Sequence, residues 1–402
     1  MNYTFSDTFS LLKPSALRES FKLAAQPGVI SLAAGSPSPQ TFPAKEMGEI
    51  AQRLLSDPRT AAPTLQYGIT EGVPALKEAI FGRMKEKYHT GREEDGILIT
   101  SGGQQGIELA AKVLLNRGNG VITESPTFSN SINTFYAFTR NVVGVSLQPD
   151  GMDLDELEKA LQHTPNVKLI YCIATFQNPT GYTVSLEKRK GIYELARKYN
   201  VIIVEDDPYY ELRYSGEHVP TIKSLDDDGR VIYVGSMSKI LSPGIRVGFI
   251  IANKELLAKL VIAKQGEDVH ANVLCQTIAA EYFRQYDIDA HIEMIRSCYR
   301  GKRDFMLQQL AQHLPENVEV LRPDGGLFLW CTMPEGCDSD ALFYDCLNKG
   351  KVVITTGSGF YPNLVGPSRA FRLSFSLPSE EQIKTAVAIV GQCVSDMIKD
   401  RC

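Results

Sequence analysis

Short apolar runs alternate with longer amphipathic stretches through the middle of the chain, and this pattern restricts the fold more than any other feature. Five runs are apolar on both faces, at 96–100, 120–123, 168–173, 201–204 and 231–234. Helix-like segments separate several of them, at 105–116, 153–162 and 186–199. Strands with two apolar faces and intervening helices are typical of a mostly parallel sheet that helices cover on both sides. The pattern therefore predicts an α/β fold with a large parallel-sheet domain.

The remainder of the chain predicts a smaller α+β domain and its connections. The run 248–252 follows Arg246 so closely that we expect it to join the large sheet in an antiparallel direction. A long helical stretch from Ala279 to Leu314 is expected to link the two domains. The small domain is expected to contain strands at 326–331, 351–354 and 370–375 and helices at 340–349 and 379–398.

These elements suggest a division of the chain into three parts. Residues 1–45 are expected to form an N-terminal arm and part of the small domain. The large domain is expected at 46–295, beginning with helices at 46–55 and 73–88, and the small C-terminal domain at 296–402. We expect a ligand in the cleft between the two domains.

The composition argues against several classes of partner. The chain of 402 residues has a net charge of -5 and no run of Lys or Arg, so we expect neither nucleic acid nor a membrane as a partner. Its eight cysteines form no CxxC pair, which is typical of buried thiols in a reducing compartment rather than of a disulfide framework or zinc site. The first residues lack a signal pattern, and no apolar stretch is long enough to span a bilayer. We therefore expect a cytoplasmic protein without a bound metal.

Polar side chains follow each of the five apolar runs. Hydroxyl, amide, carboxyl, phenol and amine groups occur in the segments 100–105, 124–128, 175–181, 205–209 and 235–239. Ligands bind beyond the carboxyl ends of the strands in an open parallel sheet. We therefore expect these side chains to share one site.

Three of these segments suggest a particular chemistry, and each also has a structural explanation. Lys239 and Arg246 would place a buried amine beside a phosphate, or would lie on a surface turn. The turn 101–104 would let backbone amides approach an anion at a helix start, or would be an ordinary turn, and it matches neither a Walker loop nor GxGxxG. Asp206 would hold a protonated ring nitrogen, with Tyr209 facing the same ligand, or would cap a helix or lie in a solvated loop.

Three motifs occur in an order that is highly specific: Asn178-Pro-Thr-Gly, Asp206-x-x-Tyr and Ser236-x-Ser-Lys. They resemble the motifs of the class I/II aminotransferases, which are fold-type-I pyridoxal phosphate enzymes. The similarity is greatest to the α-aminoadipate and kynurenine aminotransferase branch and extends over nearly the whole chain, from Lys13 to Ser374. It implies the fold of type I and pyridoxal 5'-phosphate as the cofactor.

The resemblance also implies a role for each residue of the cofactor site. Lys239 would form the Schiff base with the cofactor and then carry the proton. Asp206 would pair with the pyridine nitrogen, while Asn178 and Tyr209 would hydrogen-bond the phenolic oxygen of the ring. Phe128 would stack on the ring, or would pack in the core. The phosphate would be held by Gly103, Gln104, Ser236, Ser238 and Arg246, with Tyr67 reaching it from a second subunit.

Arg372 is the candidate for substrate recognition. Its neighbours in the run 370–375 alternate, so its guanidinium could lie on the solvent face of an edge strand. The resemblance instead implies that Arg372 binds the substrate α-carboxylate bidentately, with Asn178 and Gly35 completing the contact. Arg18 would meet an acidic substrate side chain, or would lie on a surface helix.

These roles predict a transaminase that moves the amino group of an aminoadipate-type, aromatic or branched-chain L-amino acid to a 2-oxo acid, with 2-oxoglutarate as the expected acceptor. β-Elimination or racemisation on the same fold is the alternative. A ligand-sensing regulator is a remote alternative, because the resemblance begins by Lys13 and leaves no room for a DNA-binding module. Tyr67 and Asn272 are expected to serve the site of a neighbouring subunit, which predicts a homodimer, unless both pack within their own chain.

Overall fold

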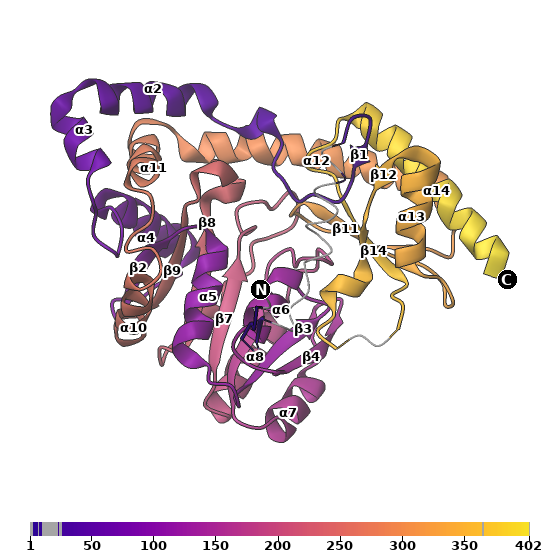
Figure 1. Ribbon diagram of the computed structural model, residues 1–402, viewed down its shortest axis with the longest axis horizontal. Coiled ribbons are helices and arrows are strands. Elements are labelled where there is room, and N and C mark those ends of the chain that lie inside the picture. Colours follow the sequence, from indigo (N-terminus) through magenta and orange to yellow (C-terminus); the bar gives the residue numbers. More distant parts are fainter. Residues whose placement is uncertain (1–2, 7, 10–22, 24–25, 364–365, 402) are drawn as a thin grey trace.

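An eight-stranded sheet forms the centre of the larger part of the molecule (Figure 1). The computed structural model describes residues 3–6, 8–9, 23, 26–363 and 366–401. The strands of this sheet follow the order β2 (Asp95–Thr100), β9 (Gly248–Asn253), β8 (Val231–Ser236), β7 (Ile202–Asp207), β6 (Val167–Cys172), β3 (Gly120–Ser125), β4 (Asn141–Gln148) and β5 (Gly151–Met152).

The sheet is mostly parallel, as the apolar pattern predicts. The neighbouring strands β8, β7, β6, β3 and β4 all pair in parallel. β9 pairs antiparallel with both β8 and β2, which confirms the prediction for 248–252. The apolar pattern does not predict β4 or β5. They lie at one side of the sheet, where Gly144 and Ser146 interrupt the apolar run of β4 and several of its side chains remain partly exposed.

Helices cover both faces of the large sheet. Successive strand residues point to opposite faces, so Leu169 and Tyr171 pack in one cluster while Ile170 and Cys172 pack in another. Burying a Leu or Ile side chain fully contributes about 1.5–3 kcal/mol, so both clusters stabilise the layered arrangement. The first face is covered by α5 (Gly103–Leu114), α6 (Ser129–Tyr136) and α10 (Lys254–Gln265), and the second by α7 (Leu154–His163) and α8 (Leu186–Lys198).

The helical stretch expected from Ala279 to Leu314 is in fact two helices, α11 (Val273–Gln285) and α12 (Ile288–His313). The Asp287 carboxylate accepts hydrogen bonds from the amides of Asp289 and Ala290, both at 3.0 Å. Aspartate is a strong N-cap residue because it satisfies amides that have no partner within the helix, so a new helix begins here.

Several shorter or peripheral helices complete the structure. They are η2 (Pro39–Thr41), α2 (Ala44–Ser56), α3 (Pro58–Leu65), α4 (Pro74–Tyr88), α9 (Ile222–Leu225), η3 (Met237–Lys239), η4 (Pro243–Ile245) and η5 (Gly357–Phe360). Within the described ranges, no helix combines the length and apolar character needed to cross a membrane.

The smaller part of the molecule contains an antiparallel sheet in the order β10 (Glu319–Val320), β11 (Phe328–Thr332), β14 (Ala370–Ser374) and β13 (Thr355–Thr356). Figure 1 shows α12 running along the top of the molecule to this part, which also holds α13 (Ser339–Gly350) and α14 (Glu380–Arg401). β1 (Ile30–Ser31) pairs in parallel with β12 (Val352–Val353), so the N-terminal segment joins the C-terminal part. The expected domain limits stay predictions, and the one at 295/296 falls within α12.

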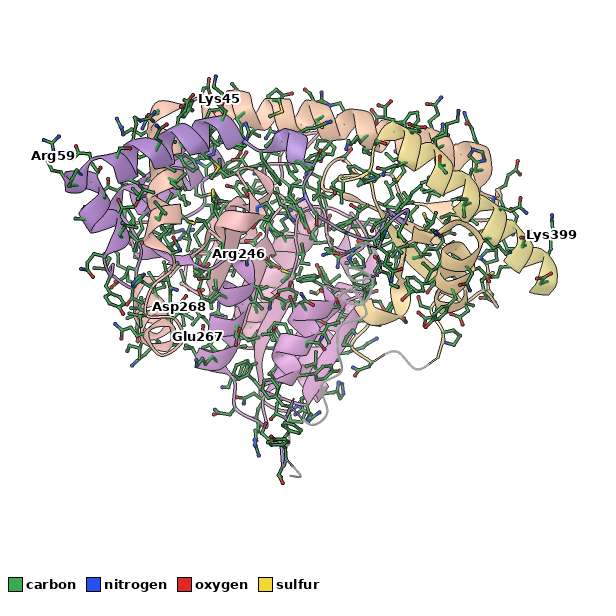
Figure 2. The ribbon with its side chains drawn as sticks, turned by 45° about the horizontal axis from the view of Figure 1, so that its top comes forward. Lys45, Arg59, Arg246, Glu267, Asp268 and Lys399 are labelled. Carbon is green, nitrogen blue, oxygen red and sulfur yellow. The ribbon has the colours of Figure 1, made fainter. Side chains whose placement is uncertain are left out.

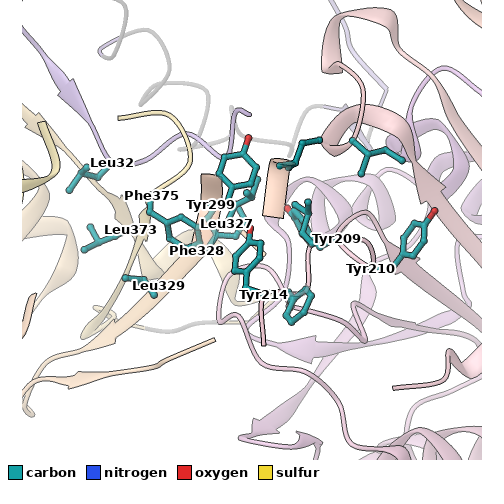
Figure 3. Packing of buried hydrophobic residues seen from close by; sticks show 14 of the residues in the cluster. Leu32, Tyr209, Tyr210, Tyr214, Tyr299, Leu327, Phe328, Leu329, Leu373 and Phe375 are labelled. Carbon is teal, nitrogen blue, oxygen red and sulfur yellow. The ribbon is translucent and has the colours of Figure 1, made fainter. Parts of the chain in front are cut away.

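A hydrophobic cluster joins the two parts of the molecule (Figure 3). Phe328 of β11 lies against Tyr209, which follows β7, with ring centroids 6.0 Å apart. Tyr214 and Phe375 make a similar contact with centroids 6.5 Å apart. This packing brings the second sheet to the carboxyl end of the first, where the predicted site residues lie.

Candidate active site

All of the predicted cofactor residues except Tyr67 line one cavity of about 370 Å³. The segments that follow β2, β3, β6, β7 and β8 all contribute to its wall, so the expectation of one shared site is correct. Sequence reasoning missed four wall residues that lie in or beside these segments: Ile107, Asn130, Ile173 and Pro208. Their proximity to the predicted residues is the only sequence signal that could have indicated them.

Lys239 ends the short helix η3, immediately after β8. The Ser236 hydroxyl accepts a hydrogen bond from the Ser238 amide at 3.2 Å and so stabilises this turn. Lys239 Nζ donates to the carbonyl oxygen of Gly35 at 2.9 Å. Desolvation lowers the pKa of Lys239 to about 8, and the positive charges of Arg372 and Arg246 act in the same direction. The structure therefore places a readily deprotonated amine in the cavity wall rather than on a surface turn.

Asp206 near the end of β7 is 5% exposed, and its two oxygens have different surroundings. Oδ2 accepts a hydrogen bond from the Tyr171 hydroxyl at 2.7 Å, and Tyr171 in turn accepts one from Ser131 Oγ at 2.8 Å. Oδ1 lies near the start of α5, 3.9 Å from where a Cβ on Gly103 would be. Burial raises the pKa of Asp206 to about 7, while the bond from Tyr171 opposes this rise. Tyr171 thus determines which oxygen is left for a ligand.

Sequence reasoning did not identify Tyr171 or Ser131 as site residues. Tyr171 is a phenol inside an apolar strand, and it is fully buried. A buried tyrosine hydroxyl usually has a hydrogen-bond partner. That requirement was the available signal, although it could not indicate Asp206 as the partner.

The start of α5 forms another part of the cavity wall. Within the described residues, no side chain caps its first amides, and Gly103 and Gln104 line the cavity wall. Gly102 has φ +85°, and a Cβ there would lie only 2.1 Å from Arg246 Nη2, so this position requires glycine. Arg246 Nη2 donates to the Ser101 carbonyl oxygen at 3.0 Å. Uncapped helix amides beside a guanidinium are suited to bind an anionic group.

Arg372 of β14 is buried, with 1% of its surface exposed, so it does not lie on a solvent face. Nη1 donates to Asn178 Oδ1 at 2.6 Å, and Nη2 donates to the Ala33 carbonyl oxygen at 2.7 Å. The guanidinium carbon lies 4.0 Å from the ring centroid of Phe328 and 5.1 Å from that of Phe360. Burial lowers the pKa of Arg372 to about 10. Nε has no partner within the described part of the chain, so the fork retains an unused donor.

The remaining predicted residues occupy different surroundings. A Cβ on Gly35 would lie 2.5 Å from the Phe328 ring, which explains why glycine stands there. Phe128 lines the cavity just before α6, and Tyr209 lines it as well, where burial raises the pKa of its phenol and keeps it protonated. Tyr67 is outside the cavity wall and 83% exposed, with its ring against His270 at a centroid distance of 5.8 Å. Arg18 lies outside the described residues.

Comparison with known families decides the identity of the chain. The model of the family described as aminotransferase class I and II matches residues 27–390. The chain belongs to this family. As a class I/II aminotransferase it is a transaminase that uses pyridoxal 5'-phosphate and acts on amino acids and 2-oxo acids. The predicted family, fold class, enzyme activity and cofactor are thereby confirmed.

Three relatives show how far the similarity of this aminotransferase extends. The aromatic-amino-acid aminotransferase 1 of Thermococcus litoralis is 39% identical over 98% of this chain and 95% of its own length. The kynurenine aminotransferase of Pyrococcus horikoshii, solved with PMP, KYN and KYA, has a TM-score of 0.92 at 36% identity and covers 98% of this chain and 97% of its own. The α-aminoadipate aminotransferase of Thermus thermophilus, solved with N-(5'-phosphopyridoxyl)-L-leucine, has a TM-score of 0.89 at 34% identity and covers 98% of both chains.

The cavity of this aminotransferase fits pyridoxal 5'-phosphate on chemical grounds. The cofactor has an aldehyde, a ring nitrogen that is active in its protonated form, and a phosphate. The cavity offers the Lys239 amine to the aldehyde and the buried Asp206 carboxylate to the ring nitrogen. The uncapped amides of α5 beside Arg246 are suited to the phosphate.

Proposed function

We propose that this aminotransferase moves the amino group of an aminoadipate-type, aromatic or branched-chain L-amino acid to 2-oxoglutarate, with Lys239 as nucleophile and proton carrier. The observation that carries the proposal is the arrangement around Asn178. This residue shares the cavity wall with Lys239 and accepts a hydrogen bond from Arg372 at 2.6 Å. An amine that can react and a guanidinium that can bind a carboxylate are therefore adjacent.

A panel of amino donors assayed with 2-oxoglutarate tests this function directly. We expect glutamate and the 2-oxo acid of the donor to form in equal amounts, with the highest kcat/KM for one of the three donor classes. Pyruvate and ammonia should not accumulate from sulfur amino acids. Release of ammonia without formation of glutamate would instead indicate an elimination, and exchange of stereochemistry alone would indicate a racemase.

Bound pyridoxal phosphate supplies an aldehyde that combines with amines and a protonated ring that withdraws electrons from the substrate. We assign the amine chemistry to Lys239 Nζ. A pKa of about 8 leaves part of the side chain neutral near pH 7, and a neutral amine is both a nucleophile and a base. The hydrogen bond to the Gly35 carbonyl oxygen orients Nζ. From this position Nζ takes the proton from Cα of the amino donor and, in the second half of the exchange, delivers a proton to the carbon of the 2-oxo acid that receives the amino group.

Asp206 is assigned to the ring nitrogen and Arg372 to the substrate carboxylate. Because Tyr171 occupies Oδ2 of Asp206, Oδ1 is the oxygen available to a protonated nitrogen. Arg372 presents a planar, buried guanidinium whose Nε has no partner in the described part of the chain, which favours bidentate binding of a carboxylate. Asn178 and Tyr209 are assigned to the phenolic oxygen of the ring, and Phe128 to its face. The phosphate is assigned to Gly103, Gln104, Ser236, Ser238 and Arg246.

Tyr171→Phe is expected to move the acidic limb of the pH profile of kcat/KM upward by about one pH unit, because a hydrogen bond to a charged group is lost. The bond from Tyr171 stabilises ionised Asp206, so its removal raises the pKa of Asp206. The carboxyl group then stays protonated to a higher pH and pairs less well with the ring nitrogen. Steady-state kinetics between pH 5 and pH 9 measure this effect.

Tyr233→Phe is the matched control. Tyr233 is as fully buried as Tyr171, but its hydroxyl has no hydrogen-bond partner within the described residues. Its removal should leave the profile in place and cost little stability, since no bond is broken. An equal displacement in both variants would contradict the role assigned to Tyr171.

We further propose a homodimer in which Tyr67 completes the phosphate site of the partner. Tyr67 is 83% exposed and absent from the cavity of its own chain, so most of its side chain is accessible to a second subunit. Asn272 has a structural role within its own chain, because its side-chain oxygen accepts a hydrogen bond from the Cys275 amide at 2.9 Å and caps α11. In a symmetric dimer, each chain would contribute its Tyr67 to the site of the other chain.

A heterodimer that carries Lys239→Ala in one chain and Tyr67→Ala in the other tests the shared site. The cavity with Lys239 intact then receives the intact Tyr67 of the other chain. Two different affinity tags allow this heterodimer to be isolated. We expect about half of the wild-type activity per dimer, well above either parent homodimer at limiting cofactor, because one of two equivalent sites is restored. If Tyr67 serves its own chain, no site is restored, and activity stays at the parental level.

The cytoplasmic location stays a prediction. Cys172, Cys331 and Cys346 are buried free thiols. Such thiols are usual in proteins of reducing compartments, which supports the proposal.

A further inference from the structure

A closed ring of hydrogen bonds lies next to the start of α5. Its members are Ser101, Gln105, Lys264 and Asp268, which we call the Lys264–Asp268 ring. The Ser101 amide and Lys264 Nζ both donate to Gln105 Oε1, at 2.8 and 3.1 Å. Lys264 Nζ also donates to Asp268 Oδ1 at 2.6 Å. Asp268 Oδ2 accepts from Ser101 Oγ at 3.0 Å and from Gln105 Nε2 at 2.9 Å.

None of the four side chains belongs to the described wall of the cavity. The ring nevertheless holds both ends of the turn 102–104, which contributes Gly103 and Gln104 to that wall. Ser101 and Gln105 flank Gly102, Gly103 and Gln104. On the other side of the turn, Arg246 donates to the Ser101 carbonyl oxygen at 3.0 Å. Figure 2 marks Arg246 and Asp268 on the same side of the molecule. The backbone of the turn is therefore held between a guanidinium and the ring.

The ring is built on an ion pair between the buried Lys264 and the partly exposed Asp268. The Lys264 side chain has no exposed surface, and a buried ammonium is costly unless a carboxylate and further hydrogen bonds compensate it. Burial opposes ionisation of Asp268, but hydrogen bonds from Lys264, Gln105 and Ser101 hold its pKa below the usual range. Asp268 therefore stays ionised at neutral pH. An expensive charge pair at this place requires a reason beyond packing.

The chain around Asp268 is also held in a strained conformation. Val269 has φ +62°, which β-branched residues rarely adopt. Asp268 anchors one side of Val269 through the ring, and on the other side His270 lies against Tyr67. Strained residues persist where their surroundings hold them, and the hydrogen bonds of Asp268 hold the residue directly before Val269.

We propose that Lys264 and Asp268 are positioning residues that hold the amides of Gly103 and Gln104 in the geometry that receives the cofactor phosphate. The inference rests on the phosphate site assigned above to Gly103, Gln104 and Arg246. Neither Lys264 nor Asp268 contacts the cofactor. Their effect is to preorganise the turn, so that binding of the phosphate does not have to order it.

Asp268→Asn tests the inference because it keeps the shape of the side chain and removes its charge. The Kd of the apoprotein for pyridoxal 5'-phosphate, measured by absorbance titration, should rise about tenfold, the effect of one charge-assisted hydrogen bond. The kcat at saturating cofactor should stay near the wild-type value. Amides 102–104 of the apoprotein should exchange hydrogen faster. Ser101→Ala removes one bond of the ring without leaving Lys264 unpaired. It should raise Kd and speed the exchange of amides 102–104 as well, again with kcat near the wild-type value.

Asp226→Asn is the matched control. Asp226 pairs with the buried Lys223 at 2.7 Å, and neither residue belongs to the cavity wall. The Asp226→Asn substitution should lower the thermal stability about as much as Asp268→Asn does. The Kd and the exchange of amides 102–104 should stay unchanged. An unchanged Kd in both Asp268→Asn and Ser101→Ala, or an equal rise in Asp226→Asn, would overturn the inference. If Asp268→Asn does not fold, Ser101→Ala decides alone.

Arg246→Met separates a failure of the inference from a failure of the proposed phosphate site. Loss of cofactor affinity in Arg246→Met with wild-type affinity in Ser101→Ala and Asp268→Asn would leave the site intact and refute the role of the ring. Wild-type affinity in Arg246→Met would refute the assigned phosphate site. The exchange of amides 102–104 in the apoprotein would still report whether the ring orders the turn, since that measurement involves no cofactor.

Discussion

Lys239→Ala is expected to reduce kcat by about 10²–10⁴-fold or more, because proton transfer by a positioned side chain alone contributes that much. The same substitution removes the nucleophilic amine, so the cofactor can no longer be attached to the protein at this position. Single-turnover measurements of 2-oxo acid formation give the rate. Mass spectrometry after borohydride reduction shows whether residue 239 carries the cofactor.

Lys239→Arg is the control that separates the effect of the positive charge from the effect of the reactive amine. The guanidinium keeps the positive charge but does not deprotonate in proteins, so it provides neither nucleophile nor base. We expect it to be as inactive as the Ala variant. Small primary amines added to Lys239→Ala should restore part of the activity by taking over proton transfer. A Lys239→Ala protein that transaminates at the wild-type rate would show that the role assigned to Lys239 is wrong.

Arg372→Lys is expected to have the second largest effect, a loss in kcat/KM of about 30-fold to several thousand-fold, since altering one partner of a buried charge pair costs on the order of 2–5 kcal/mol. The guanidinium contacts the rings of Phe328 and Phe360, and its Nη1 donates a hydrogen bond to Asn178. An ammonium is not planar and cannot reproduce this fork. The loss should appear mainly as a higher KM for both the amino acid and the 2-oxo acid in steady-state kinetics.

Two comparisons make the Arg372 result specific. Reaction with an amine that lacks the carboxylate should be equally slow in the wild type and in Arg372→Lys, because the contact is absent in both. Arg303→Lys changes another largely buried arginine, which lies 5.5 Å from the Tyr214 ring and outside the cavity wall. It should affect stability but not KM. An unchanged KM in Arg372→Lys would exclude the assigned carboxylate contact.

Local patterns in the sequence predict much of the fold because they depend on backbone geometry. Alternation of strands that are apolar on both faces with amphipathic helices predicts the layered sheet, and the short connection after Arg246 predicts the antiparallel strand β9. The pattern misses β4 at the side of the sheet, where a strand does not need two apolar faces. It also merges α11 and α12, whose separation depends on the cap at Asp287.

In the site too, some residues are predicted by local sequence patterns, whereas others depend on contacts between distant parts of the chain. The polar ends of five strands and the motif around Lys239 are readable from the sequence, and they predict ten of the fourteen residues of the cavity wall. Tyr171 and the Lys264–Asp268 ring were not predicted. Ser101 and Asp268 are 167 positions apart, and their contact depends on how α10 packs beside α5.

Sequence patterns alone predicted the parallel core strands, the polar residues at their ends and the family to which the enzyme belongs. Which oxygen of Asp206 is available, the burial of Arg372 beside two rings and the exposure of Tyr67 became clear only from the three-dimensional structure. The reason is physical. Periodicity and turn chemistry act between near neighbours along the chain, whereas burial, pKa and hydrogen-bond partners depend on elements that are distant in sequence and meet only when the sheet and its helices pack together.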